Sequence, residues 1–381
     1  MRRTLFTEDH EAFRELARDF IEKEVVPAYP QWEKAGRMPR EAFAKLGETG
    51  IMGITLPEEY GGGGQDDYRY NMVLQEEAAR ALVTLSTVRT QLEVILPYFL
   101  HYANDEQRQR WFPGLADGSL LTAIAMTEPG TGSDLRGIRT SARRDGDHWI
   151  LNGQKTFISS GIMADLVVVA ACTDPDAGSR GLSLFVVERD TPGFVRGRQL
   201  DKIGLPAQDT AELFFDDARI PAANLLGEEG RGLQYLMGHL PRERLGVSAK
   251  AMATTRAIYE LTVEYCKDRK AFGKPVAEFQ NTRYKLAEVA TQIKVGRAFI
   301  DQCVERLVAG TLDTATASMA KLWATDTQGR VVDECLQLFG GYGYMAEYPI
   351  SRFWTDARVL RIYGGTSEIM KELVARSLLG R

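Results

Sequence analysis

Hydrophobic and polar positions follow three different patterns along this chain of 381 residues. Over the first third, apolar residues such as Phe13, Leu16 and Phe20 recur at helical spacing. The helices that this pattern predicts run from Thr7 to about Pro27 and over 39–50, 67–82 and 86–103. The N-terminal third is therefore expected to be helical.

The middle third consists of short runs of β-branched and aromatic residues bounded by Gly, Pro and Asp. The predicted strands are 140–144, 148–151, 155–159, 166–172, 182–188 and 211–215. The pairs Asp145-Gly146 and Asn152-Gly153 are strong signals for tight turns between strands. Because no long helical pattern alternates with these runs, a doubly wound parallel sheet is disfavoured and a small antiparallel barrel or sandwich is expected.

The last third returns to helical periodicity, now in longer segments. The predicted helices are 243–270, 278–309, 314–339 and a final helix that begins near Thr366. Long helices with short connections predict an antiparallel four-helix bundle. The expected fold is therefore α+β and multidomain, with an N-terminal helical domain over 1–122, a middle β domain over 123–227 and a C-terminal bundle over 228–381.

Composition excludes several classes of function. Lys and Arg number 47 against 52 Asp and Glu, and the net charge of −5 disfavours a general nucleic-acid partner. No apolar run approaches the ~20 residues of a membrane span. The N-terminal residues also lack the apolar core and cleavage site of a secretory leader, so a cytoplasmic location is expected. The four Cys and four His are scattered, which argues against a disulfide framework or a metal site.

Generic catalytic motifs explain little of this sequence. It contains neither a GxxxxGK[ST] phosphate loop nor a GxSxG nucleophile elbow. Ser318 and Lys321 match SxxK, but they lie inside a predicted helix without companion motifs, and we interpret the match as a coincidence. The GxGxxA match at 341–346 follows a helix rather than a strand, which argues against a dinucleotide site.

Three clusters of unusual composition remain. Residues 125–134 are rich in small, hydroxyl and glycine residues that bring backbone N–H groups close to a ligand, although an inter-domain linker has a similar composition. In 152–160, Phe157 and Ser159 are two apart and suit stacking on a ring while bonding its edge, although a core strand fits equally well. Glycine pairs beside predicted helix ends, at 340–341 and 364–365, suit either a ligand or a helix cap.

In series, MTEPGTGSD, NGQKTFIS, RKAFGKP, LQLFGGYGY and RIYGGTSEIMKE resemble the acyl-CoA dehydrogenase family, and the resemblance runs from about residue 5 to 380. The family consists of FAD-dependent enzymes that oxidise acyl-CoA thioesters to trans-2-enoyl-CoA. The resemblance implies an electron-transferring flavoprotein as acceptor and a homo-oligomer, usually a tetramer built as a dimer of dimers. It also implies helical, β and helical domains, the same order as the three patterns above.

By position, the resemblance implies several groups of site residues. Those near the flavin are Met126, Thr127, Gly132, Ser133, Phe157, Ile158 and Ser159, with Phe157 at a position where many relatives have Trp. Those for the adenosine diphosphate half of FAD, bound across a subunit interface, are Arg269, Phe272, Gln280, Gln337, Gly340 and Gly341, joined by Thr366 and Glu368. Those for the substrate are Ser133, Arg244, Gly364 and Gly365.

The position of the catalytic base is a departure from much of the family. Many members carry a glutamate in a Tyr-Glu-Gly-Thr run, and here 363–366 read Tyr-Gly-Gly-Thr. The long-chain and isovaleryl branches instead carry it at the head of the first bundle helix, in a Glu-Arg-Leu run, which matches 243–245. Glu243 is therefore the expected base. The alternative is a first-turn glutamate favoured by the helix dipole.

Other functions remain open within the same resemblance. The thioester carrier is either CoA or an acyl-carrier protein, the latter in a biosynthetic pathway. A flavin oxidase or monooxygenase of the same fold is a second alternative, and a non-catalytic flavin protein is a third. The helix near 84–96, including Ser86, Thr90 and Glu93, is expected to line the far end of the acyl pocket.

Overall fold

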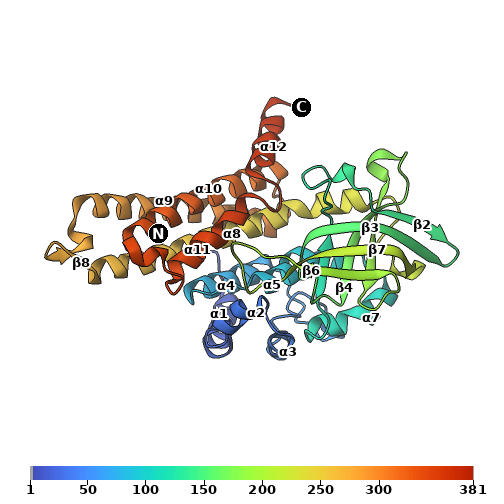
Figure 1. Ribbon diagram of the computed structural model, residues 1–381, viewed down its shortest axis with the longest axis horizontal. Helices are drawn as coiled ribbons and strands as arrows, with labels where there is room; N and C mark the ends of the chain where they lie inside the picture. Colours follow the sequence, from blue (N-terminus) through green and yellow to red (C-terminus); the bar gives the residue numbers. More distant parts are fainter. Residues whose placement is uncertain (1–2, 381) are drawn as a thin grey trace.

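The computed structural model describes residues 3–380, so positions 1, 2 and 381 of the predicted terminal domains lie outside the described residues. In the N-terminal domain, helices pack around one core of aromatic and aliphatic side chains. They are α1 (Glu8–Phe20), α2 (Tyr29–Ala35), α3 (Arg40–Glu48), α4 (Tyr68–Arg80), α5 (Ser86–Arg89), α6 (Leu96–Tyr102) and α7 (Asp105–Ala116). Figure 1 shows this helical layer below the bundle and beside the β domain.

The predicted helix over 86–103 is present but irregular. Between α5 and α6, residues Thr90–Ile95 form a π-helix, a wider turn that is found mostly at functional sites. A second π-turn, Ile21–Val25, continues α1 toward the predicted end near Pro27. The wide turn at 90–95 matters for the site because it places Glu93 against the C-terminal bundle.

The middle domain is a twisted, mainly antiparallel sheet of strands in the order β1-β4-β2-β3-β7-β6, with β5 paired to β4. The strands are β1 (Thr122–Ala125), β2 (Ser141–Asp145), β3 (His148–Ser159), β4 (Leu166–Cys172), β5 (Leu182–Glu188), β6 (Phe194–Gln199) and β7 (Thr210–Pro221). Two pairings are parallel, β1 with β4 and a single pair of residues between β2 and β4.

The tight turn predicted at Asn152-Gly153 is wrong. Residues 148–159 form one strand, β3, and the register against β7 shifts between Leu151 and Gly153. Gly153 adopts φ +148°, and a Cβ there would overlap Thr140, so this glycine serves a bulge and a close approach of two backbones. The turn predicted at Asp145-Gly146 does join β2 to β3, with Gly146 at φ +61°.

Strands β4 and β5 are buried along almost their whole length. Val168 and Ala170 face the core shared with the N-terminal helices, whereas Val167 and Val169 face the interior of the β domain. A strand covered on both faces needs apolar residues at every position rather than at alternate ones. The continuous apolar runs in the sequence are therefore explained by the helices that cover the sheet.

The C-terminal domain is built on three long helices that run side by side (Figure 1). They are α8 (Gly232–Asp268), α9 (Gln280–Val308) and α10 (Thr314–Phe339), followed by α11 (Pro349–Ala357) and α12 (Ser367–Leu379). A short hairpin of β8 (Lys270–Ala271) and β9 (Lys274–Pro275) joins α8 to α9 at the far end of the bundle. The structure confirms the predicted α+β fold, and α12 projects from the bundle instead of completing it (Figure 1).

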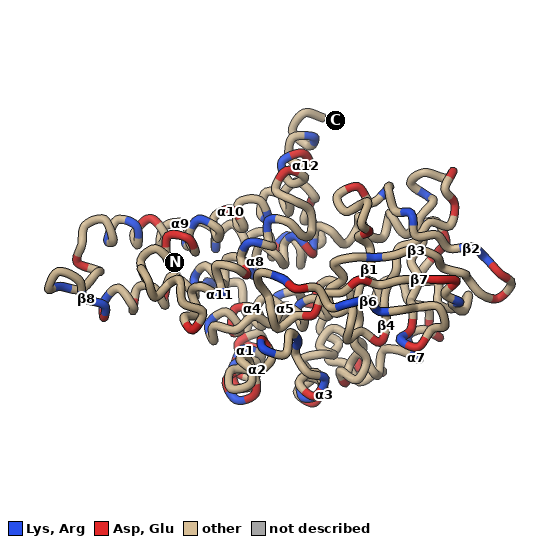
Figure 2. The backbone as a smooth tube through the Cα atoms, in the orientation of Figure 1, with Lys and Arg blue, Asp and Glu red and all other residues tan. Residues whose placement is uncertain are grey.

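Within the described residues, no helix is long and apolar enough to cross a membrane. In Figure 2, basic and acidic residues are interspersed along the backbone of the bundle and the β domain. The domain boundaries remain predictions; β1 begins at Thr122 and α8 begins at Gly232.

Candidate active site

Glu243 lies well inside α8, about three turns after the helix begins at Gly232. The sequence predicted a helix starting at 243, but α8 begins earlier and passes through Pro241. Because the helix dipole acts within the first turn, it does not account for a glutamate at this position. The alternative explanation of Glu243 as a first-turn residue is therefore wrong.

The carboxylate of Glu243 faces the turn that precedes α12. Gly364 in this turn adopts φ +63°, and a Cβ on it would lie 3.2 Å from Glu243 Oε1. The glycine therefore leaves the space beside its Cα to the carboxylate from α8. This contact explains in spatial terms why a glutamate at 243 accompanies a glycine at 364.

Glu243 is buried, with only 9% of its surface exposed, and this burial affects the pKa of its carboxyl group. Desolvation raises its pKa above the ordinary value, and the positive charges of Arg89, Arg244 and Lys321 oppose that rise. A carboxylate with a raised pKa is a stronger base than one in water. The surrounding cations also favour its ionised form, which a base requires.

Two buried cations, Lys321 and Arg244, donate hydrogen bonds to backbone carbonyls of the 363–366 turn. Lys321 Nζ on α10 donates to the carbonyls of Gly365 at 2.7 Å and Leu360 at 3.0 Å. Arg244 makes two long hydrogen bonds of 3.5 Å, one to the carbonyl of Gly364 and one to Ser318 Oγ. Ser318 and Lys321, the SxxK match, thus lie beside the site as supports of the turn. The sequence interpretation missed Lys321, although a lysine on an otherwise buried helix face was a usable signal.

The loop after β1 is fixed to β3 by a buried ion pair. Lys155 Nζ donates to Glu128 Oε1 at 2.8 Å and to the carbonyl of Met126 at 3.0 Å. Glu128 also accepts from the backbone N–H groups of Arg139 and Thr140. The carbonyl of Thr127 accepts from Thr156 N at 3.0 Å. The predicted ligand loop is therefore anchored at its start, while Gly132 and Ser133 at its tip are exposed.

Phe157 lies on a second bulge of β3, where the register shifts between Lys155 and Ile158. Its φ is +59°, a conformation rarely adopted by residues other than glycine, and its ring is 69% exposed. Ser159 is half-buried, whereas the side chain of Ile158 is in the core of the β domain, so Ile158 offers only its backbone to a ligand. A strained backbone that presents an exposed aromatic ring is typical of a functional surface.

The residues expected to bind the adenosine diphosphate half of FAD do not all lie together in one chain. Arg269, Gln337, Gly340 and Gly341 line one depression of about 500 Å³ at the far end of the bundle. Phe272 is outside this depression, 96% exposed in the β8–β9 hairpin. Gln280 is also outside it, at the first position of α9, where Nε2 donates to Tyr284 Oη at 2.5 Å.

Thr366 and Glu368 lie at the start of α12, away from the β8–β9 end of the bundle (Figure 1). Thr366 caps the helix by accepting from Ile369 N at 3.3 Å. The two residues line a depression together with basic side chains, which are Arg330, Arg358, Arg361 and Lys371. A helix N-terminus among basic side chains suits an anionic group.

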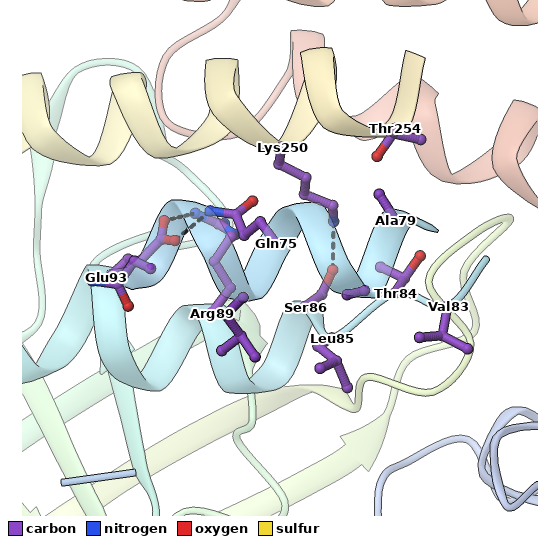
Figure 3. A pocket seen from close by; sticks show the side chains of 13 residues that line it. Gln75, Ala79, Val83, Thr84, Leu85, Ser86, Arg89, Glu93, Lys250 and Thr254 are labelled. Carbon is purple, nitrogen blue, oxygen red and sulfur yellow. Dashed lines mark hydrogen bonds and ion pairs between the residues drawn. The ribbon is translucent and has the colours of Figure 1, made fainter. Parts of the chain in front are cut away.

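A cavity lies between α4, α5 and α8, and its lining includes Lys250, seven residues after Glu243 on α8 (Figure 3). Ser86 and Glu93 line it, as expected for the far end of an acyl pocket. Thr90 does not line it, because its hydroxyl donates to the carbonyl of Ser86 and accepts from Gln208 on the β-domain side. Arg89 also lines the cavity and was missed; an arginine within a predicted buried helix was the available signal.

The fold and the buried carboxylate opposite a glycine turn define the class of three-domain dehydrogenases expected from the resemblance. Family models for the acyl-CoA dehydrogenase N-terminal, middle and C-terminal domains match residues 7–119, 123–218 and 230–379. The chain is 48% identical to the long-chain specific mitochondrial acyl-CoA dehydrogenase of Sus scrofa, over 99% of this chain and 88% of that protein. The chain therefore belongs to the acyl-CoA dehydrogenase family, and it is an oxidoreductase.

Two solved structures of this fold illustrate the similarity. An acyl-CoA dehydrogenase from Geobacillus kaustophilus is 50% identical, with a TM-score of 0.97 and coverage of 99% of this chain and 100% of that one. A glutaryl-CoA dehydrogenase from Mycobacterium smegmatis in complex with FADH2 is 30% identical, with a TM-score of 0.90 and coverage of 99% and 96%. Members of this family are flavoproteins.

Proposed function

We propose that this protein converts an acyl-CoA to the trans-2-enoyl-CoA in an FAD-dependent α,β-dehydrogenation, with Glu243 as the base. The observation that carries the proposal is the placement of Glu243 Oε1 next to the Gly364 turn, 3.2 Å from where a Cβ on Gly364 would lie. A buried carboxylate with a raised pKa is suited to removing the weakly acidic α-proton of a thioester.

The turn at 363–366 supplies the second part of the chemistry. As the α-proton leaves, negative charge develops on the thioester oxygen and needs a hydrogen-bond donor. We assign the backbone N–H of Gly364 to this role, because the turn is held in place by Lys321 from behind. Arg244 is buried against Ser318 and acts as a support of the same turn rather than as a direct substrate ligand.

The residues present fit a flavin. The exposed ring of Phe157 offers a stacking face, and the hydroxyl-rich loop at 127–133 offers donors beside it. When bound, FAD supplies the acceptor for the β-hydride at N5. Phe157, Ser159, Thr127 and Ser133 would hold the ring, and the chain's own part is to orient the acyl group and to exclude water from Glu243.

A second copy of the chain would complete the cofactor site. Phe272 is almost fully exposed at the β8–β9 end of the bundle, and Thr366 lies at the start of α12, so one chain leaves these groups apart (Figure 1). We infer a homo-oligomer, in keeping with a dimer of dimers, in which one copy's Arg269 and Phe272 reach the cofactor of another. An electron-transferring flavoprotein as acceptor and a cytoplasmic location remain predictions.

The decisive test is Glu243→Gln. This variant is expected to keep its flavin but to lose bleaching of the flavin band on addition of acyl-CoA, because the amide cannot accept the α-proton. The matched control is Glu260→Gln on the same helix, where an exposed carboxylate pairs with Arg256. Undiminished bleaching in Glu243→Gln would remove that residue from the role.

The same purified holoprotein distinguishes the alternative substrates and functions. Competition between acyl-CoA and the matching acyl-carrier-protein thioester identifies the carrier. Rapid oxygen consumption by the substrate-reduced protein would indicate an oxidase or monooxygenase instead. Sedimentation of the holoprotein reports whether the oligomer is a dimer or a tetramer.

A further inference from the structure

The cavity between α4, α5 and α8 contains a lysine that forms no close ion pair among the described residues. Lys250 extends from α8 into the cavity, and its Nζ donates to Ser86 Oγ at 2.6 Å (Figure 3). Among the described residues, no carboxylate lies within 4.0 Å of this nitrogen. An ammonium has three N–H donors, so most of its hydrogen-bonding capacity is unused.

The neighbouring carboxylates already have partners. Glu93 forms an ion pair with Arg89, at 3.5 Å between Oε2 and Nη1, and accepts a hydrogen bond from Gln75. Asp356 accepts from Leu205 N at 2.5 Å and from Thr84 Oγ1 at 3.2 Å. Arg89 and Glu93 thus balance each other, and Asp356 is bonded only by neutral donors and forms no close ion pair with Lys250.

Buried donors without a hydrogen-bond partner line this part of the molecule, beside the unpaired acceptors Glu93 Oε2 and Gln75 Oε1. Arg89 is 5% exposed, and its Nε and Nη1 have no hydrogen-bond partner among the described residues. Leaving buried donors unpaired is costly unless a ligand satisfies them. The side of the cavity formed by Arg89 and Lys250 therefore has the chemistry of an anion receptor.

Lys250 lies on the same face of α8 as the proposed base, Glu243. Glu243 and Lys250 are seven residues apart, which is two helical turns or ~10.5 Å along the axis. Gly246 lies between them and leaves room for the Glu93 carboxylate, which would overlap a Cβ at that position. With C–C bonds of ~1.5 Å that advance roughly 1.25 Å each in a zigzag, the span corresponds to about eight bonds.

We propose that the acyl chain of the substrate ends in a carboxylate, which pairs with Lys250 and is bonded by the free N–H groups of Arg89. The proposal rests on the acyl thioester function proposed above and specifies its substrate class as an ω-carboxyacyl-CoA of about eight to ten carbons. The cavity is narrow, about 30 Å³, which suits a single small polar end group rather than a ring.

The ionisation of Lys250 agrees with this geometry. Burial, with a smaller contribution from the nearby Arg89, lowers its pKa to about 7, while Asp356 and Glu93 oppose this shift. A carboxylate at the cavity end would favour the charged ammonium.

The test compares matched thioesters on the purified holoprotein. The rate constant kcat/KM is measured with octanoyl-CoA against octanedioyl-CoA, and with decanoyl-CoA against decanedioyl-CoA. The protein is expected to prefer the dioyl thioester at one or both lengths. In Lys250→Met, the ratio of dioyl to plain thioester is expected to fall by about ten- to a hundred-fold, the range for a hydrogen bond to a charged group.

Lys267→Met is the matched control, because Lys267 is exposed on the same helix and pairs with Glu264. It is expected to keep the ratio of the unsubstituted protein. Retention of the flavin spectrum shows that Lys250→Met is folded, and Lys250→Gln gives the same comparison if the methionine variant loses flavin. An unchanged ratio in the folded variant, or a preference for plain thioesters at both lengths, would overturn the proposal.

Failure of the proposed function has a different signature. Butyryl-CoA is too short to reach Lys250, so it tests the base and the flavin alone. If neither butyryl-CoA nor any longer thioester reduces the flavin, the dehydrogenase function itself is wrong. If butyryl-CoA and the plain thioesters reduce it while the dioyl thioesters have no advantage, only the carboxylate receptor is wrong.

Discussion

Replacing Lys155 by Met removes one partner of the buried ion pair that anchors the loop carrying Thr127 and Ser133. The side chains of Lys155 and Glu128 are 0% and 7% exposed, and methionine is similar to lysine in size. The variant leaves Glu128 with two backbone N–H bonds but without its cation. Breaking a buried pair in this way costs about 3–5 kcal/mol.

The assay is thermal unfolding of the holoprotein together with its flavin content. For a chain of this size, Tm changes by ~2 °C for each kcal/mol of unfolding free energy. Lys155→Met is therefore expected to lower Tm by about 6–10 °C. Flavin content is expected to fall as well, because the carbonyl of Met126 loses its donor and the loop is released from β3. The control Lys23→Met, in an exposed pair with Asp19, should cost less than ~0.5 kcal/mol.

Two further measurements test whether the uncompensated charge of Glu128 causes the loss of stability in Lys155→Met. The double variant Glu128→Gln with Lys155→Met carries no uncompensated charge, so it is expected to be more stable than Lys155→Met alone. Because the Lys155 ammonium and hydrogen bonds hold the pKa of Glu128 below its ordinary value, that carboxylate stabilises the fold above pH ~4.3. Its contribution disappears as the pH falls through the folded-state pKa. A Tm change below ~2 °C with full flavin content would refute the reasoning.

Three other predictions concern the base and its turn. Gly364→Glu is expected to lower flavin reduction at least ~10-fold, since the new side chain strains a φ of +63° and places a second carboxylate beside Glu243; unchanged reduction would contradict this. The raised pKa of Glu243 predicts that kcat/KM increases with pH through a midpoint above 4.5, and stopped-flow reduction with a midpoint at or below that value would be inconsistent. Lys321→Met is expected to destabilise the protein by about 2–4 kcal/mol in denaturant unfolding and to raise KM; Lys34→Met, at an exposed position of α2, should do neither.

The motifs predicted which segments form the site, but not how its parts meet. Glu243 and Gly364 are far apart in the sequence, and only the packing of α8 against the 363–366 turn brings the carboxylate within 3.2 Å of where a Gly364 Cβ would lie. Phe157 was proposed to stack on a ring, with a core strand as the alternative, yet its positive φ depends on a bulge that arises from pairing β3 with β7. Register shifts are properties of two strands and are invisible in one.

The buried cations are the other part that the sequence did not assign. Arg89, Lys250 and Lys321 each occur in segments with helical periodicity, and their chemistry depends on which neighbours they meet. Lys321 meets two carbonyls and supports the turn, whereas Lys250 meets only the hydroxyl of Ser86. Two buried lysines thus have different roles. A buried charge is costly unless it is bonded, so the number of hydrogen-bond partners determines whether a lysine is satisfied by the protein alone.

The sequence by itself determined the three-part α+β architecture, since hydrophobic periodicity is local and distinguishes helices from strands. Through the resemblance to the family, it also indicated the candidate base, because a glutamate at 243 and a glycine at 364 are read at single positions. Only the tertiary structure decided that Glu243 lies deep within α8, that Asn152-Gly153 is a bulge, and that a cation lies two turns from the base. These features depend on contacts between segments distant in sequence, and such contacts are fixed by packing rather than by local preference.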